Sequence, residues 1–228
     1  KNIKLNKTEI KEVISSYVEL TAKIILKLNS NVKKYKNGEK LFRNIKLSKN
    51  STINKIYLLH NVCKAYGTLP FANLARMAFV AVEFLNSFVN LKIISQYEKD
   101  LFLETMKSIS LELNKTLHKS KKQFLSKFGH LRPNTYEIST PNYQENFKNY
   151  FKNSKPKIMR SRKFNFSYAH KKKINALLKK NNFHKINSKI LINFIEESIY
   201  QRESSKLFFT KIINEIFHQL KILAKRIK

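Results

Sequence analysis

This chain has very little of the residues that form turns and disulfides. Its 228 residues include one cysteine, three glycines and four prolines. A lone cysteine, Cys63, excludes an internal disulfide framework and is typical of a reducing compartment, so with no signal peptide in view we expect a cytoplasmic location. Because an all-β protein needs many turns, the scarcity of glycine and proline argues against that fold class.

The chain also lacks an apolar run of membrane-spanning length. The best candidate, residues 74–94, carries Arg76 and Glu83, so we expect a buried or half-buried helix and no membrane contact. No H-x-x-x-H or C-x-x-C pair occurs, and His60 and Cys63 offer too few ligands for a metal ion. We therefore predict no metal site.

Acidic residues are scarce as well: 15 stand against 46 basic residues, for a formal charge of +31. Residues 115–189 alone hold 20 basic and two acidic residues, or +18. Such a field attracts polyanions, including nucleic acid. However, 39 of the basic residues are lysine, and lysine with many asparagines and isoleucines is also what A/T-rich codons encode. The excess of basic residues therefore has two open explanations: a surface selected to bind anions, or solvated helix faces with no binding role.

Apolar residues at helical spacing dominate the rest of the chain. They predict an all-α fold, an irregular bundle of about six to eight helices in a single domain over residues 1–228. The first helix is expected from Asn6, in a capping box with Glu9, to Asn29. Residues 30–51 indicate a polar connection around one short helix. The chain begins at a lysine and stops inside a helical pattern, so we expect an excerpt of a longer multidomain polypeptide.

Later helices follow the same periodicity. One is expected over residues 52–65 with Gly67 as its C-terminal cap, and a mostly buried one from the cap Thr68 with Pro70 in its first turn. Three more are expected: residues 95–128 with a Ser95–Glu98 capping box, 168–178, and 190–223 as one or two long helices.

The least helical stretch lies at residues 129–143. It holds Gly129 and two of the four prolines, and because proline fixes φ and cannot donate a backbone hydrogen bond, we expect a shaped loop. The loop sets His130, Arg132 and Tyr136 within seven residues. Loops held by rigid helices often carry binding residues, although this one could also simply turn the chain between two helices.

Two further features allow both a functional and a structural interpretation. Arg76 lies in an apolar helical run seven residues before Glu83, so it either pairs within the protein or meets an anion in a substrate cleft. Residues 144–166 form a basic linker rich in aromatic residues. Its rings either stack on single-stranded nucleic acid or pack on the domain.

Three stretches have the character of motifs: residues 66–81 (Y-G-T-L-P-F-A-N-L-A-R-M-A-F-V-A), 129–143 (G-H-L-R-P-N-T-Y-E-I-S-T-P-N-Y) and 202–210 (R-E-S-S-K-L-F-F-T). In this order they resemble motifs of bacterial phosphoenolpyruvate-synthase-like (PEP-utilising, dikinase-type) phosphotransferases, which are related to rifampin phosphotransferase. The chain departs from the family pattern at Asn134, where a glycine is expected, and at Asn142, where an arginine is expected.

The resemblance implies the helical acceptor-side region of an ATP-dependent phosphotransferase, a kinase in the broad sense. In that family a histidine on a swivelling domain takes a phosphoryl group from ATP and carries it to an acceptor. ATP and Mg²⁺ would be bound by an ATP-grasp domain, and neither that domain nor the phosphohistidine domain is recognisable in these residues. This chain would hold no catalytic residue and would frame the site of a small-molecule acceptor through Arg132, His130, Tyr136 and Arg76.

Two other functions stay open. A basic, all-helical nucleic-acid-binding protein would use the +18 segment and the aromatic linker, but it gives no reason for the motif-like loops. A folded helical unit with neither catalysis nor a ligand is the third.

Overall fold

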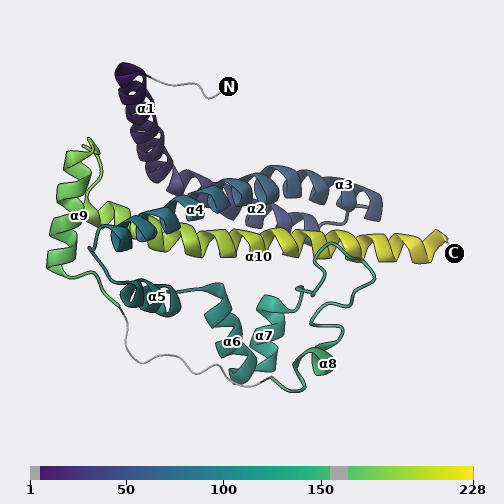
Figure 1. Cartoon of the computed structure of the whole chain (residues 1–228). Helices are drawn as coiled ribbons and strands as arrows, with labels where there is room; N and C mark the ends of the chain where they lie inside the picture. The colour runs from purple at the N-terminus through teal and green to yellow at the C-terminus, as the bar shows by residue number, and fades with distance from the viewer. Residues whose placement is uncertain (1–5, 155–163, 228) are drawn as a thin grey trace. The chain divides into compact units, whose positions relative to one another are not determined.

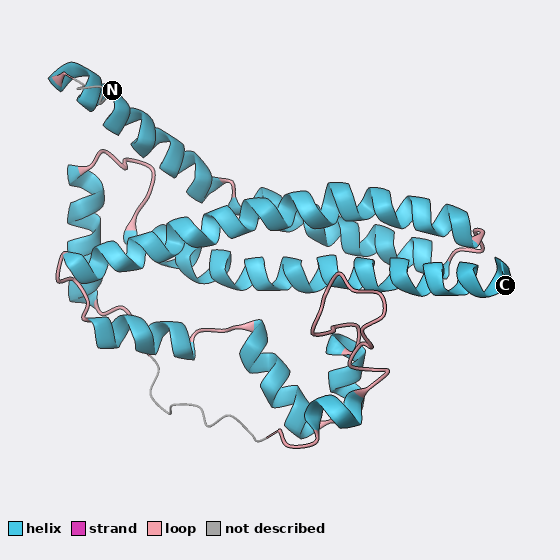
Figure 2. Ribbon diagram, turned by 45° about the vertical axis from the view of Figure 1, so that its right-hand side comes forward, coloured by secondary structure: helices cyan, strands magenta, loops and turns pink. Residues whose placement is uncertain are grey.

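The computed structural model describes residues 6–154 and 164–227, and it confirms the all-α prediction. Within these residues the secondary structure is helical, with no strands (Figure 2). Counted with the continuous run Thr52–Asn90 as one helix, they form eight helices of eight residues or more. The elements labelled in Figure 1 are α1 (Lys7–Leu26), α2 (Leu28–Leu47), α3 (Thr52–Val62), α4 (Leu69–Asn90), α5 (Gln96–Thr105), α6 (Ile109–Lys119), α7 (Lys121–Phe128), α8 (Phe147–Phe151), α9 (Tyr168–Lys180) and α10 (Ser188–Ile227); a π-helical segment, η1 (Cys63–Thr68), joins α3 to α4.

The helices belong to two compact units. The first unit comprises Lys1–Asn29, Met77–Met106 and Arg160–Ser198, and the second comprises Ser30–Arg76, Lys107–Met159 and Ile199–Lys228. Helices α4 and α10 each contribute to both units. The prediction of a single domain stays a prediction.

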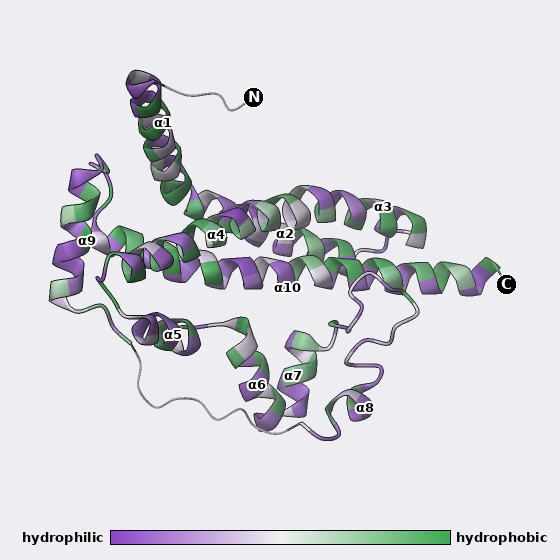
Figure 3. Cartoon of the chain, viewed as in Figure 1, coloured by the Kyte–Doolittle hydropathy of each residue, from purple (hydrophilic) through white to green (hydrophobic). Residues whose placement is uncertain are grey.

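In the first unit, α1 begins as predicted. The Asn6 side chain accepts the backbone N–H groups of Thr8 and Glu9, and the Glu9 carboxylate accepts the N–H of Asn6 at 2.7 Å. The helix ends at Leu26, three residues before the predicted end. Figure 3 colours the apolar residues of α1 green, and many of their side chains are exposed. The apolar residues of α1 that are at least 40% exposed are Ile10, Val13, Ile14, Tyr17, Leu20 and Leu26.

The core of the first unit is aromatic. Phe166 makes edge-to-face contacts with Phe88, at 6.2 Å between ring centroids, and with Phe102, at 5.5 Å. Leu85 of α4 and Ile174 of α9 are completely buried in the same unit. Helix α9 begins at the predicted residue and extends two residues beyond the predicted end.

In the second unit, the prediction of a polar connection over residues 30–51 is wrong. The 20-residue helix α2 (Leu28–Leu47) covers most of this segment, and it lies alongside α10 (Figure 1). Tyr35 and Phe42, seven residues apart, are buried on one face of α2, where both rings contact Phe208. The sequence was misleading because Gly38 and the many lysines are typical of a loop, whereas the buried aromatic rings on one face of the segment pack it as a helix.

Gly38 allows α2 to pack closely against its neighbours. A Cβ atom at this position would overlap Tyr66 Cβ and stand 3.0 Å from Phe208 Cε1. Tyr66 Cβ is fixed to its backbone and cannot rotate away. The glycine that suggested a helix break is therefore a requirement of helix packing.

We expect Gly38→Ala to destabilise the second unit, against the usual benefit of alanine in a helix. Alanine gains about 1 kcal/mol over glycine in helix propensity, but overpacking at a well-packed site costs about 1–3 kcal/mol. Because the added Cβ would overlap an atom that cannot move away, we expect a cost at the upper end of that range. The expected net loss is about 1–2 kcal/mol. Urea unfolding followed by circular dichroism measures it. Gly67→Ala is the comparison, because its Cβ would stand 3.3 Å from Phe209 Cδ2 and should cost less.

The predicted boundary at residues 65–70 does not exist. Gly67 does not cap a helix and Thr68 does not begin one, because η1 continues α3 directly into α4. Gly67 is buried against Phe209 and Ile212, and a helix end at such a position would leave backbone groups without water or other partners. The wider π-helical turn carries the chain past Pro70 without an interruption.

The sequence predicted no apolar run of membrane-spanning length, but the continuous helix Thr52–Asn90 is long and apolar enough to cross a membrane by length and composition alone. It is the one such helix among the described residues. This is weak support for a membrane span, because the core helix of a globular protein passes the same test. Leu59, Leu74 and Leu85 of this run are almost completely buried.

The single helix predicted over residues 95–128 is also wrong, although its Ser95–Glu98 capping box is present. Three helices, α5, α6 and α7, occupy the region. Ser108 accepts the N–H of Leu111 at the start of α6, and Ser120 ends α6 and then caps α7. Serine side chains compete with helical hydrogen bonding in this way, which the apolar periodicity does not reveal. Gly129 follows α7 as its cap, as predicted.

Candidate functional site

The loop predicted at residues 129–143 is present, with no helix between Gly129 and Asn146. Its ends are tied together by backbone hydrogen bonds. The Tyr143 N–H donates to the Leu131 carbonyl at 2.7 Å, and the Gln144 N–H donates to the Gly129 carbonyl at 3.0 Å. A loop whose ends meet is compact and has a defined shape. We refer to residues 129–146 as the closed loop.

Arg132 holds the closed loop from within. Its guanidinium donates to the carbonyls of Glu137, at 3.2 Å, and Thr140, at 3.1 Å. It also donates to Asn214 Oδ1 on α10 at 2.6 Å and lies over the Phe217 ring. Arg132 is only 7% exposed, and burial lowers its pKa. The residue predicted to bind a substrate thus pins its own loop to α10.

A second network extends from the same asparagine. Asn142 donates from Nδ2 to Asn214 Oδ1 at 3.0 Å, and Asn142 and Glu145 exchange reciprocal backbone-to-side-chain bonds of 2.8 Å. Burial alone would raise the pKa of Glu215, but the hydrogen bond from Gln219 and the charge of Lys46 hold it below its ordinary value. These groups surround a polar cavity of about 260 Å³, which is lined by Lys46, Arg132, Asn142, Gln144, Glu145, Asn214, Glu215, His218 and Lys221.

His130 also faces α10 but lies at a different cavity. Its Nε2 is 3.1 Å from the Leu207 carbonyl, so Nε2 carries the hydrogen and donates it; the Thr210 hydroxyl lies 3.3 Å away. Burial and then the charge of Lys211 lower the pKa of His130 from 6.5 to about 4, outweighing the hydrogen bonds to carbonyls. His130 is therefore neutral at pH 7 and acts as a donor to α10.

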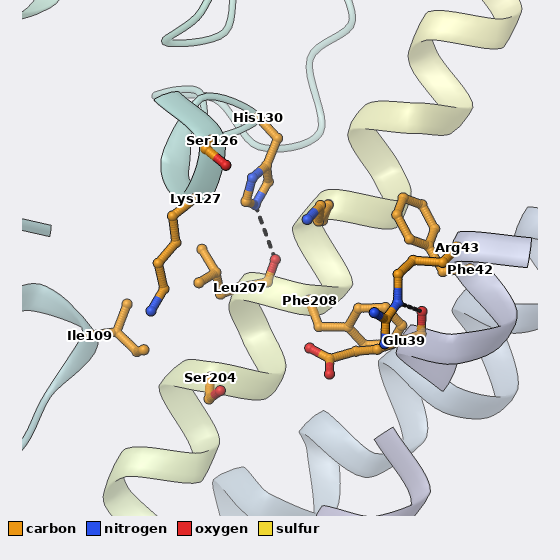
Figure 4. Close-up of a pocket in the computed structure, with 11 residues that line it drawn as sticks. Glu39, Phe42, Arg43, Ile109, Ser126, Lys127, His130, Ser204, Leu207 and Phe208 are labelled. Carbon is orange, nitrogen blue, oxygen red and sulfur yellow. Dashed lines mark hydrogen bonds between the residues drawn. The ribbon is translucent and has the colours of Figure 1, made fainter. Parts of the chain in front are cut away.

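The cavity at His130 is a cleft of about 480 Å³, formed between α2, α7, the closed loop and α10. Figure 4 shows His130, Ser126 and Lys127 on one side of it, facing the side that is formed by α2. The lining residues are Glu39, Phe42, Arg43, Ile109, Ser126, Lys127, His130, Ser204, Leu207, Phe208 and Lys211. We call this the basic cleft, because three of them are cationic side chains and one is a carboxylate.

The charges in the basic cleft are unevenly paired. Lys127 forms an ion pair with Glu112 of α6. Arg43 donates from Nε to the Glu39 backbone carbonyl at 3.4 Å, a bond drawn in Figure 4. Burial raises the pKa of Glu39 against the opposing charges of Lys211 and Arg43, and burial also lowers the pKa of Lys211.

The four predicted site residues do not meet at one point. His130 lines the basic cleft and Arg132 lines the separate polar cavity. Tyr136 is 73% exposed, with its ring 6.4 Å from that of Phe209. Arg76 is exposed and donates to Asn73 at 3.3 Å, while Glu83 accepts from Asn86 at 3.1 Å.

The three motif-like stretches nevertheless converge on one side chain, Phe209 of α10. Phe71, from residues 66–81, stacks on it at 6.0 Å with the rings nearly parallel. Gly67 of the same stretch lies directly against the Phe209 ring. Tyr136, from the closed loop, also contacts it, with its ring tilted by 58° to that of Phe209. Phe209 is only 8% exposed, so it forms the centre of this meeting point.

Sequence reasoning missed the charged residues of the basic cleft. Glu39 and Arg43 lie in the segment that was interpreted as a connection, and Lys211 follows the third motif-like stretch directly. Four-residue spacing places Glu39 and Arg43 on one helix face, which would have been a signal had residues 30–51 been interpreted as a helix.

The aromatic residues of the basic linker pack within the protein where the structure describes them. Phe147 and Phe151 of the linker surround Phe124 together with Tyr143 of the closed loop, at centroid distances between 5.0 and 6.2 Å. Phe164 and Phe166 contact Phe102 and each other: Phe102–Phe164, Phe102–Phe166 and Phe164–Phe166. This outcome matches the packing interpretation. Residues 155–163, which carry most of the linker's cations, lie outside the described residues.

Across the described chain, no group of three or more histidine, cysteine, aspartate or glutamate side chains could hold a metal ion. Comparison with models of known protein families, with curated proteins and with solved structures finds no match. What the chain does is therefore inferred from its own residues.

Proposed function

We propose that this chain is the helical acceptor-side region of an ATP-dependent, phosphoenolpyruvate-synthase-like phosphotransferase in the cytoplasm. The observation that carries the proposal is the convergence of the three motif-like stretches on Phe209. Stretches that lie far apart in the sequence and resemble motifs of one family are expected to meet if they serve one site.

The acceptor would occupy the basic cleft. The closed loop contributes His130 to it, and the third motif-like stretch contributes Ser204, Leu207 and Phe208. In this proposal the chain positions a small-molecule acceptor and supplies no catalytic residue. An ATP-grasp domain of the same polypeptide would bind ATP and Mg²⁺, and a histidine on a swivelling domain would carry the phosphoryl group between them.

Nucleic-acid binding has less support as the main function. A single-strand binder needs aromatic faces that are free to stack on bases. In the described part of the linker, Phe147 and Phe151 instead pack around the buried Phe124. The high positive charge alone gives only a salt-dependent, sequence-independent attraction.

The test uses the full-length polypeptide and ATP labelled in its β- and γ-phosphates. We expect an acid-labile phosphohistidine that the small-molecule fraction of a cell extract discharges. Arg132→Lys keeps the charge but loses the forked hydrogen bonds to Glu137, Thr140 and Asn214, so it should leave the labelling intact and slow the discharge about tenfold or more.

The matched control is Lys225→Gln, an exposed change on α10 outside both cavities, which should alter neither step. Absence of any ATP-dependent phosphohistidine overturns the proposal, as does a reading frame that closes immediately on both sides of these residues. Normal discharge in Arg132→Lys would contradict the part assigned to the closed loop.

A further inference from the structure

We infer that the basic cleft binds the anionic group of the acceptor, a phosphate or a carboxylate, through Arg43 and Lys211. That the bound ligand is the phosphoryl acceptor rests on the proposed function. The anion site itself rests only on the shape and charges of the cleft.

The cleft has the size and the two-sided lining of a small-molecule site. Its volume of about 480 Å³ lies within the range of about 300–1,000 Å³ that is typical of ligand pockets. Phe42, Phe208 and Ile109 are 9% exposed or less and provide an apolar floor. Ser126, Ser204 and the charged side chains provide polar walls, so a ligand with an apolar body and one charged group fits both surfaces.

The charged group should be negative, because the cleft carries more cations than carboxylates can neutralise. Lys127 is already paired with Glu112, which leaves Arg43 and Lys211 opposite the lone carboxylate of Glu39. Lys36 adds positive potential from outside the cleft. Lys46 also acts on Lys211, but it is paired with Glu215 at 3.1 Å, as Lys127 is with Glu112, so neither pair changes the balance of charge in the cleft.

The pKa of Lys211 agrees with this excess of positive charge in the cleft. Burial lowers the pKa of Lys211, and the neighbouring positive charge of Lys46 lowers it further. An anion bound beside Lys211 would favour its charged form and would be held by charge-assisted hydrogen bonds, about twice as strong as neutral ones. Arginine adds a planar fork that matches both phosphate and carboxylate geometry.

The experiment titrates the whole chain with methyl phosphate, and separately with acetate, at constant ionic strength. Amide chemical shifts of Arg43 and Lys211 in heteronuclear NMR spectra report binding. We expect saturable shifts, about tenfold weaker binding in Lys211→Gln, and about threefold tighter binding in Glu39→Gln, because the latter removes the competing negative charge. Tighter binding of methyl phosphate than of acetate would assign the group as a phosphate, and the reverse order a carboxylate.

Lys206→Gln is the matched control for a chain with so much positive charge. It makes the same charge change at an exposed position of α10 five residues before Lys211, but it lies outside the cleft, so it should not alter the binding. Equal weakening in Lys206→Gln and Lys211→Gln, or weaker binding in Glu39→Gln, overturns the inference. Circular dichroism confirms that the variants keep their helices.

The result also separates the inference from the proposed function. If methyl phosphate or acetate binds at Lys211 but the full-length polypeptide never forms phosphohistidine, the anion site stands and the phosphotransferase proposal fails. If phosphohistidine forms and discharges but neither probe binds at Lys211, the inference fails alone.

Discussion

Replacing Phe124 with alanine is expected to lower the free energy of unfolding of the second unit by about 3–5 kcal/mol. Phe124 is completely buried, and its ring contacts four aromatic rings, those of Phe128, Tyr143, Phe147 and Phe151. Alanine would leave a cavity and remove these ring contacts, and such a cluster can collapse only partly around the gap.

The closed loop should loosen together with this cluster. Tyr143 joins the ring cluster and also closes the loop through its N–H bond to Leu131. Urea unfolding followed by circular dichroism measures the stability loss. Hydrogen exchange of the Tyr143 and Gln144 amides, which donate across the loop ends, measures the local opening and should become faster in Phe124→Ala.

Phe79→Ala is the matched control, because Phe79 is 67% exposed on α4. It removes the same atoms from a site with little buried contact, so its effect should stay within about 0.5 kcal/mol. A similar loss in both variants would contradict the assignment of Phe124 as the anchor of the loop. A loss under about 1 kcal/mol in Phe124→Ala would do so as well.

Stability is also expected to fall by about 3 kcal/mol as the pH drops from 6.5 to 4, through His130 alone. Its pKa is lowered to about 4 in the folded protein, against 6.5 for a free histidine. Above pH 6.5 both states are neutral. Between these two values the unfolded chain takes up a proton that the folded chain does not, so the folded state loses stability with decreasing pH.

His130→Gln isolates this contribution. Glutamine does not titrate, and its amide can still donate to the Leu207 carbonyl that accepts the Nε2–H. The pH dependence of the urea midpoint between pH 7.5 and 4 should therefore be flatter in the variant than in the wild type. Parallel curves, or an NMR titration of the His130 ring with its midpoint near 6.5, would refute the role of burial at this position.

The sequence by itself determined the fold class and several element boundaries. Apolar spacing at a period of 3.6 residues predicted helices, and the capping boxes at Asn6 and Ser95 fixed two helix starts. The two prolines and Gly129 predicted the loop that follows α7. These features are local, because each depends on residues within one or two helical turns of each other.

Only the tertiary structure decided which interpretation of an ambiguous residue was right. Gly38 and Gly67 indicated a loop and a cap by local rules, but each instead lets another helix or ring approach, which depends on Tyr66, Phe208 and Phe209.

The candidate site depended on the fold in the same way. The chemistry of Arg132 suggested a ligand contact, yet its partners are two carbonyls of its own loop and Asn214, 82 residues away. Lys211 and Glu39 carry no local signal, and they face one cleft because α2 and α10 pack together. Contacts between distant segments depend on the packing of all the helices at once, and no local pattern of residues encodes them.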